Sequence, residues 1–216
     1  MNTLNQSLQK KLFSPARLRG YINIQEHEDN LALIASIAHK VGILEITLRN
    51  KIDSILSKTN ENWLESLPQE IIDSSNPYNK DSSKDKVISS QNFGFWIKIV
   101  EHYKIHNQLF NIYFLDNLDF KKYFAKNKNR FSRKANLRNY HKAKAVLLLL
   151  RLIRNRAFHF ENLYKMNTRG PRLSVTIQSE NSKQSVIISI HPSQIKIFLD
   201  DLLASLHKDL VYYAEK

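Results

Sequence analysis

The residues that could do chemistry gather in one segment, RLIRNRAFHFE at positions 151–161. Arg154 and Asn155 precede His159 by five and four positions, directly after the apolar run at 145–150. An arginine binds phosphate through a planar fork of donors, and a histidine exchanges protons near neutral pH. A helix with this ending has the minimum needed to cleave RNA without a metal: His159 moves the proton and Arg154 stabilises the phosphate charge.

The spacing of this pair sets a geometric condition. Residues five apart on an ideal helix point about 140° away from each other, so the two side chains converge poorly unless the helix ends near residue 158. A two-fold dimer would help in another way, by bringing two copies of the pair around one phosphate. Asn155 lies one turn before His159 and could hold the imidazole in one orientation. The simpler alternative is a helix-end histidine that caps carbonyls beside arginines facing water.

A basic segment precedes this helix. Between positions 121 and 144 there are ten lysines and arginines, one histidine and no acidic residue, interleaved with Tyr123, Phe124, Phe131 and Tyr140. Cations neutralise phosphates and aromatic rings stack on unpaired bases, which favours a site for single-stranded RNA. The alternative is a solvated charged face whose aromatic residues turn inward. The candidate RNA-binding residues are Lys121, Lys122, Lys126, Lys128, Arg130, Arg133, Lys134, Arg138, His141, Lys142 and Lys144.

Other constellations are weaker. His102 and His106 lie four positions apart, a spacing that zinc can use, but the chain has no cysteine and no evident third ligand. Only four glycines occur, and they form neither a phosphate-binding loop nor a dinucleotide-binding motif. We therefore expect no metal and no cofactor. Glu45 and Arg49, also four apart, form either a surface ion pair or a support for the site.

The elements that must position these residues are mainly helices. Apolar residues recur every three or four positions over four segments, which predicts a helix in each. The predicted helices cover 27–58, 92–115, 136–165 and 193–213. The helix over 136–165 is apolar on nearly every side in its middle, so we expect it at the centre of a bundle.

Two segments interrupt the helical pattern. Residues 73–91 are rich in serine, asparagine, aspartate and lysine and predict a long polar loop. Alternating apolar residues over 172–191, bracketed by two prolines, predict a β-hairpin inserted between helices. The predicted fold class is all-α, a helical bundle with a small β-hairpin insertion near the C-terminus.

Length and composition indicate one domain over residues 1–216. The first residues show no signal-peptide pattern, the longest apolar run has six residues and cysteine is absent. These features predict a cytoplasmic protein that does not span a membrane. The formal net charge of +13 favours a polyanionic partner such as RNA, although selection for solubility or a lysine-rich proteome would produce the same excess.

Three blocks of the sequence together resemble the Abi-like (abortive phage infection) proteins of the HEPN superfamily. The blocks are LEITLRNKI at 44–52, FGFWIKIV at 93–100 and RLIRNRAFHFENLY at 151–164. Their order and spacing agree over about 44–164, which is most of the chain. The last block contains the superfamily's Rx4–6H motif, as Arg154 and His159 with four residues between them. Any one block is weak, and three in order are specific.

The resemblance implies a HEPN-like helical bundle, usually dimeric, with a composite ribonuclease site at the interface between subunits. It implies metal-independent cleavage of RNA that leaves a 2′,3′-cyclic phosphate and a 5′-hydroxyl. It carries over Arg154 and His159 as catalytic residues and Asn155 as the polar residue of the motif. The residues in a supporting role would be Glu45, Arg49, Asn50, Arg151 and Glu161.

One position departs from the family pattern. Relatives often read His-His-Glu where this chain has His159, Phe160 and Glu161. The task of the second histidine is therefore absent or moved. Glu161 remains available to tune His159 or to form a bond across a dimer.

Three functions follow from these observations. The favoured one is a ribonuclease that acts in anti-phage abortive infection or as a toxin on tRNA, mRNA or a phage transcript. The first alternative is a HEPN module that binds RNA or a partner protein without chemistry. The second is a DNA-binding regulator, which rests on charge alone. A toxic nuclease also needs restraint, from an antitoxin protein, a structured small RNA or the loop at 73–91.

Overall fold

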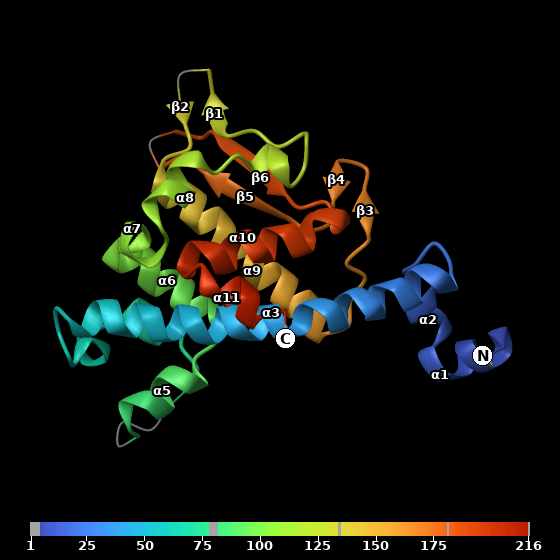
Figure 1. The fold of residues 1–216 in the computed structure, drawn as a ribbon, viewed down its shortest axis with the longest axis horizontal. Helices are drawn as coiled ribbons and strands as arrows, with labels where there is room; N and C mark the ends of the chain where they lie inside the picture. Colours follow the sequence, from blue (N-terminus) through green and yellow to red (C-terminus); the bar gives the residue numbers. More distant parts are fainter. Residues whose placement is uncertain (1–4, 78–81, 134, 181, 216) are drawn as a thin grey trace.

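The fold is mostly helical, with 61% helix and 9% strand. The structure is a computed structural model, which describes residues 5–77, 82–133, 135–180 and 182–215. Two long helices, α3 (Ile24–Ser57) and α9 (Asn139–Phe158), form the framework, with shorter helices and small β-hairpins around them (Figure 1). The prediction of a helical fold with a small hairpin near the C-terminus is confirmed at this level.

The helix α3 is the longest helix and runs along one side of the molecule (Figure 1). Asn23 begins it, because its side chain accepts a hydrogen bond from the backbone N–H of Glu26 at 2.9 Å. Buried residues then recur mostly at intervals of three and four, from Leu33 to Leu56, and pack against α9 and α10 (Ile195–Leu206). Among the described helices, α3 alone is long and apolar enough to cross a membrane, and this buried stripe gives a packing reason for its apolar character.

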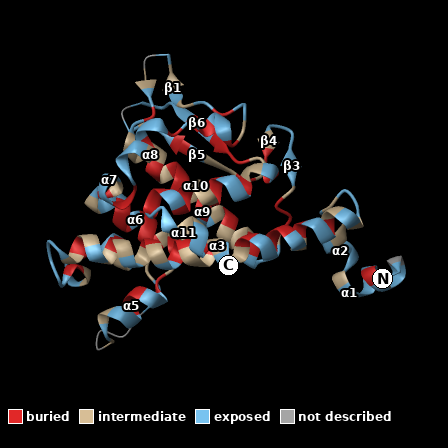
Figure 2. Cartoon of the chain, viewed as in Figure 1, coloured by how far each residue is buried: buried red, intermediate tan, exposed pale blue. Residues whose placement is uncertain are grey.

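The helix α9 lies at the centre of the fold, in contact with α3 and with α6 (Phe93–Tyr103). Its apolar run at 145–150 is buried on nearly every side, as predicted (Figure 2). The helix is shorter than predicted at both ends. Residues 135–136 form a short strand in place of the first turn of the helix. At the other end, His159 leaves the helical conformation, with φ −94° and ψ 6°.

The predicted helix over 92–115 is divided into three helices. They are α6, α7 (His106–Leu109) and α8 (Ile112–Asn117). The first break comes at Lys104, whose left-handed φ of 54° ends α6. All three helices still pack on α9, so the division changes their directions and keeps their place in the bundle.

The polar segment 73–91 contains a short helix that the sequence did not predict, α5 (Lys84–Ser90). Residues 78–81 of this segment lie outside the described residues. The helix projects from the body near one end of α3 (Figure 1), where Lys84 Nζ lies 2.8 Å from Asp53 Oδ1. Two short helices lie between α3 and this segment, η1 (Trp63–Ser66) and α4 (Gln69–Ile72).

Small antiparallel hairpins lie across the bundle from α3 (Figure 1). The hairpin predicted over 172–191 is confirmed as β5 (Ser174–Gln178) paired with β6 (Ser185–Ser189). Ile177 and Ile188 are fully buried, which fixes this hairpin on the core. Two further hairpins have strands of two or three residues, too short to leave an alternating pattern in the sequence. They are β1 (Arg130–Ser132) with β2 (Ala135–Asn136), and β3 (Met166–Asn167) with β4 (Gly170–Pro171).

The predicted helix over 193–213 is interrupted as well. It comprises η3 (Pro192–Gln194), α10 and α11 (Asp209–Tyr213). His207 breaks it, because its backbone is extended, with φ −163° and ψ 133°. The apolar stripe predicted for this segment is still buried, since Phe198, Leu199 and Leu202 of α10 are fully inaccessible to solvent.

An N-terminal arm precedes α3 and consists of α1 (Gln6–Phe13) and α2 (Pro15–Leu18). The arm extends beyond one end of α3 (Figure 1). It is tied to the loop that follows α9, because Arg17 Nη1 donates to the Phe160 carbonyl at 2.9 Å. Asn162 Nδ2 adds a bond of 2.8 Å to the Gly20 carbonyl. The beginning of the chain therefore helps to build the surroundings of His159.

Candidate functional site

Arg154 lies near the end of α9 with its guanidinium fixed on three sides. Its Nε donates to Glu45 Oε2 at 3.1 Å, and its Nη1 donates to Asn155 Oδ1 at 3.3 Å. Its Cζ lies 5.7 Å from the centroid of the Phe158 ring, within the range of a cation–π contact. The Nη2 group has no partner among the described residues, so it is the donor left for a ligand.

Glu45 of α3 holds Arg154 in this position. Its other oxygen, Oε1, accepts from Arg49 Nη2 at 2.5 Å, and Arg49 Nη1 donates to the Ser89 carbonyl at 2.9 Å. The glutamate is only 8% exposed and lies between two guanidinium groups, which compensate its charge. Glu45 and Arg49 therefore support Arg154 and are more than a surface pair. Asn50 is exposed and makes no side-chain hydrogen bond to a described residue.

Arg154 borders a pocket of about 570 Å³, which we call the arginine pocket. The cations that line it are Lys98, Lys144, Arg151 and Arg154. Lys144 is paired with Glu101, at 2.6 Å. Gly94 of the FGFW block forms part of the wall, and a Cβ there would lie 3.2 Å from Arg151 Cζ. The absence of a side chain at this glycine therefore lets Arg151 lie against α6.

His159 follows the last residue of α9 and lies in a different pocket of about 310 Å³, which we call the histidine pocket. Its imidazole is exposed and has no hydrogen bond or ion pair within the part of the chain that the structure describes. The polar and charged residues around it are Arg17, Tyr21, Glu161, Asn162, Lys165 and Arg172. Arg154 and His159 of one chain thus line two separate pockets, although the helix ends at residue 158.

Two contacts expected for His159 are replaced by others. Asn155 does not orient the imidazole, because its side-chain oxygen accepts from Arg154 and only its backbone carbonyl meets the His159 N–H, at 3.1 Å. Glu161 pairs with Arg156 Nη1 at 2.6 Å and with Arg172 Nη2 at 3.0 Å. Asn155 therefore positions the guanidinium, and Glu161 forms a wall of the histidine pocket.

Exposed apolar side chains lie beside Arg154, at Phe158, and in the histidine pocket, at Phe160, and Ile46 follows Glu45 in α3. Ile46, Phe158 and Phe160 have exposed fractions of 58%, 46% and 51%. Phe160 also has a left-handed φ of 52°, which costs a non-glycine residue about 1 kcal/mol or more. Exposed aromatic residues grouped beside a polar site are typical of a surface that another molecule covers.

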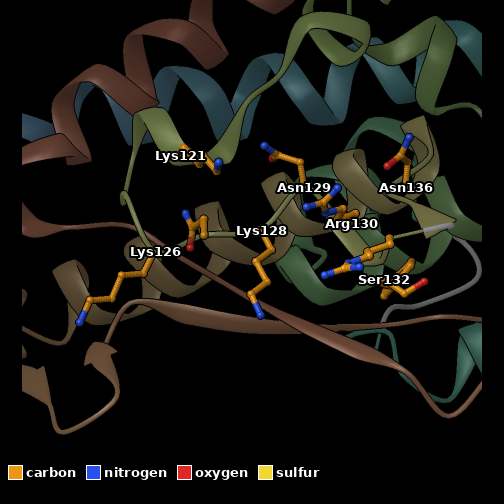
Figure 3. Close-up of a pocket in the computed structure, with 10 residues that line it drawn as sticks. Lys121, Lys126, Lys128, Asn129, Arg130, Ser132 and Asn136 are labelled. Atoms are coloured by element: carbon orange, nitrogen blue, oxygen red, sulfur yellow. The ribbon is translucent and has the colours of Figure 1, made fainter.

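The first half of the basic segment forms a groove of about 730 Å³ beside the β1–β2 hairpin, which we call the basic groove (Figure 3). The cations that line it are Lys121, Lys126, Lys128, Arg130 and Arg133. None of the five forms a salt bridge with another described residue, and no described acidic residue lines the groove. Lys126 and Lys128 extend to the same side of their loop (Figure 3). Apart from the longer-range interaction of Lys121 with Asp119, the groove therefore presents positive charge to solvent or to a ligand.

A buried asparagine fixes the loop that bears these lysines. Asn127 Nδ2 donates to the carbonyls of Phe120 and Ser189, at 2.7 and 2.8 Å. Its Oδ1 accepts from the Ser189 N–H at 2.9 Å. Because Asn127 points inward, its neighbours Lys126 and Lys128 point to solvent. These bonds attach the loop, which follows η2 (Phe120–Lys122) in the chain, to the β6 strand. Nothing in the sequence distinguished Asn127 from the other asparagines.

Three lysines predicted to bind RNA already have partners within the protein. Lys122 Nζ lies 2.5 Å from Asp201 Oδ2, and Lys144 Nζ lies 2.6 Å from Glu101 Oε1. Lys142 Nζ donates to two backbone carbonyls, at 2.7 and 3.1 Å. These three cations therefore have partners within the fold, and their contact with RNA stays a prediction.

His141, the histidine predicted to bind RNA, is packed inside the fold. It is 5% exposed, and its Nδ1 accepts a hydrogen bond of 3.2 Å from the Arg138 N–H at the start of α9. Burial lowers the pKa of His141, and the Glu180 carboxylate opposes that shift. Arg138 itself is exposed, and Lys134 lies outside the described residues.

The aromatic residues of the segment mostly serve the core. Tyr123 is buried, and its hydroxyl donates to Asp201 at 2.7 Å; burial and this bond raise the pKa of Tyr123. The rings of Phe131 and Tyr140 pack against His141, with centroid distances of 4.8 and 3.8 Å. The inward-facing alternative therefore describes these three rings better than stacking on bases.

Among the residues that the structure describes, no group of three or more His, Cys, Asp or Glu side chains could hold a metal ion. His102 is exposed, and its ring lies 4.8 Å from that of Tyr103. Burial lowers the pKa of His106. The four-residue spacing of the two histidines therefore does not bring a third ligand with it.

Comparison of the chain with protein-family models, curated proteins and solved structures finds no match. The site residues that the sequence did not predict are Arg17 of the arm and the cations around β3 and β4. The stretch from Lys165 to Arg172 holds three cations and no acidic residue, a pattern that could have predicted a second basic surface. Arg17 had no local pattern, because it meets the Phe160 carbonyl from 143 positions away.

Proposed function

We propose that the protein is a metal-independent endoribonuclease of the HEPN type, with Arg154 and His159 as catalytic residues. The observation that supports this best is the Arg154 guanidinium, which Glu45 fixes beside an open pocket at the end of the helix that His159 terminates. A cation fixed in advance can stabilise developing phosphate charge without reorganisation. The resemblance of three sequence blocks to Abi-like proteins adds the role, that of an anti-phage or toxin effector in the cytoplasm.

The proposed reaction is an intramolecular transesterification of RNA. The 2′-oxygen forms a bond to the adjacent phosphorus, while the bond from that phosphorus to the 5′-oxygen of the next nucleotide breaks. His159 takes the proton of the 2′-hydroxyl and, as the imidazolium, returns a proton to the departing 5′-oxygen. Arg154 stabilises the charge on the non-bridging oxygens. The products are a 2′,3′-cyclic phosphate and a 5′-hydroxyl.

A complete site requires a second copy of the chain, because Arg154 and His159 of one chain line different pockets. In a two-fold dimer formed around the end of α9, the arginine of one subunit faces the histidine of the other. The exposed side chains of Ile46, Phe158 and Phe160 supply apolar surface for that contact. The basic groove captures the RNA, and an antitoxin protein or a structured RNA restrains the activity.

The test is end-group analysis of a defined RNA incubated with the purified protein in EDTA. The unmodified protein should produce 2′,3′-cyclic phosphate and 5′-hydroxyl ends. Arg154→Ala and His159→Ala should each reduce cleavage about a hundredfold or more, with unchanged circular dichroism. Lys58→Ala, at an exposed lysine without a salt bridge to a described residue, is the control. Undiminished cleavage by both catalytic variants overturns the proposal.

Mixing the two inactive variants tests the composite site. A mixed dimer of Arg154→Ala and His159→Ala subunits retains one intact pair, formed by the arginine of one subunit and the histidine of the other. Random exchange should therefore restore about a quarter of the original activity. A mixture as inactive as its components contradicts pairing between subunits.

A second function, RNA binding without cleavage, is favoured by Phe160, which stands where relatives often have a histidine. It predicts intact RNA in the EDTA experiment together with a salt-dependent mobility shift. Competition between single-stranded RNA and duplex DNA separates this function from that of a DNA-binding regulator, which only the net charge supports.

A further inference from the structure

The β3–β4 hairpin lies between the cations of the basic groove and those around His159. The groove shares Lys126 and Asn127 with a neighbouring pocket of about 280 Å³, which the tip of the β3–β4 hairpin lines. Arg169 lies at that tip, is exposed and forms no salt bridge with a described residue. Lys165 and Arg172 flank the same hairpin and line the histidine pocket. The hairpin therefore connects the two pockets.

The β3–β4 hairpin is fixed in this connecting position. Gly170 has a φ of 137°, and a Cβ there would lie 3.3 Å from the ring of Phe124, so the hairpin approaches the loop of the basic groove closely. At its base, the Arg172 N–H donates to the Lys165 carbonyl at 3.0 Å. The Arg172 guanidinium is held by Glu161, also at 3.0 Å. Figure 1 places β3 and β4 between the β1–β2 hairpin and the N-terminal arm.

The histidine pocket has an excess of cations of its own. Arg17 Nη1 donates to the Phe160 carbonyl at 2.9 Å, which places its guanidinium in the pocket that His159 lines. Lys165 is exposed and has no salt bridge to a described residue. The pocket thus combines three cations with a single described carboxylate, Glu161, which is already shared between two arginines.

We propose that a single strand of RNA follows this surface from the basic groove, past Arg169 and Lys165, to His159. The phosphates are neutralised in turn by the groove cations, by the hairpin cations and finally by Arg17. The end point rests on the proposed ribonuclease function, whereas the path does not. A flexible single strand can enter successive pockets on either side of a hairpin tip, which a stiff duplex cannot do.

The test measures RNA affinity in the His159→Ala variant, so that binding is read without cleavage. Fluorescence anisotropy compares single-stranded RNAs of roughly 4 and roughly 16 nucleotides. Arg169→Glu should weaken binding of the longer RNA about tenfold or more, because only this RNA reaches beyond the groove. It should change binding of the shorter RNA less than about twofold. Lys165→Glu should show the same dependence on length.

The control is Lys58→Glu, which makes the same charge change at the C-terminal end of α3, away from the β3–β4 hairpin (Figure 1). It should change the affinity for neither RNA. Equal losses for both lengths, or no loss for either, overturn the proposed path. Duplex DNA that competes as well as the longer RNA overturns the choice of a single strand. If the length dependence appears but the unmodified protein never cleaves RNA, the path stands and the ribonuclease function fails.

Discussion

The basic groove and the arginine pocket are both rich in cations, and they differ in what those cations already contact. The groove cations form no salt bridge in the described part of the chain, and Lys121 has only a longer-range interaction with Asp119. In the arginine pocket, Glu45 holds Arg154 and Glu101 holds Lys144. An unpaired cation attracts a phosphate from a distance, whereas a paired one is fixed and acts on what has already arrived. The difference suits one region to capture and the other to positioning.

Removing the groove cations should have the largest effect and tests the capture half of the comparison. The residues to replace with alanine are Lys126, Lys128, Arg130 and Arg133. Each phosphate contact with a single strand contributes about 0.7 to the slope of log affinity against log salt, so losing four should lower affinity about a hundredfold near physiological salt. Anisotropy titrations at several salt concentrations measure both quantities. If replacement of the exposed Lys58 and Lys86 by alanine lowers the slope equally, the groove cations contribute no more to RNA binding than other surface cations.

Glu45→Gln tests the arginine pocket and should lower the free energy of unfolding. It leaves Arg49 and Arg154 close together without their shared counter-ion, which costs about 2 kcal/mol of the free energy of unfolding. For a chain of this length, the Tm should fall by about 6 °C. Thermal denaturation measures the change, with Glu70→Gln, at an exposed carboxylate, as the control. A Tm equal to that of the unmodified protein would mean that Glu45 does not hold the arginines.

Lowering the pH should destabilise the fold near the basic groove, where His141 packs against Phe131. Burial lowers the pKa of His141 below 6.5; Glu180 opposes the shift, and Arg138 and Lys144 add to it. The unfolded chain therefore binds the proton more readily, so the stabilisation is complete above about pH 6.5 and is lost as the pH falls through the folded-state pKa. His141→Asn keeps an acceptor and cannot titrate. Between about pH 7.5 and 5 it should therefore lose less stability than the unmodified protein.

Thermal denaturation of both proteins at the two pH values measures this difference. Burial also lowers the pKa of His27 and His106, but these residues contribute equally to both proteins. No histidine is among the described residues that line the arginine pocket, so its contacts should be unaffected. Identical pH dependence of the two proteins would contradict the buried, neutral state of His141.

The parts of the fold that the sequence predicted well are those with a long repeating pattern. The period of α3 and the alternation of β5 and β6 both reflect burial of one face, which the pattern of apolar residues reports directly. The end of α6 was missed because a lysine, Lys104, adopts the left-handed conformation that glycine usually supplies. The two shortest hairpins were missed because their strands are too short to alternate.

The candidate site was predictable in its residue types and not in its pairings. The basic segment and the end of α9 could be read from composition and spacing. The sequence could not show which cations are unpaired, because the pairs join distant positions. Lys122 contacts Asp201, 79 positions away, and Glu45 contacts Arg154, 109 positions away. The separation of Arg154 from His159 was not predictable, because the helix ends at residue 158, the condition set for convergence, and the two residues still line different pockets. The contribution of Arg17 to the histidine pocket likewise depends on the arrangement of the whole chain.

The long reach of these contacts has a consequence for biosynthesis. The contact of Arg17 with Phe160 cannot form until the ribosome has added 143 more residues. The contact of Glu45 with Arg154 likewise requires 109 more residues. Nascent chains fold as whole domains once enough of the sequence has emerged. A translation product that stops before residue 154 has the lysine-rich loop and lacks Arg154 and His159. Under the proposed function, such an unfinished copy can bind RNA and cannot cleave it.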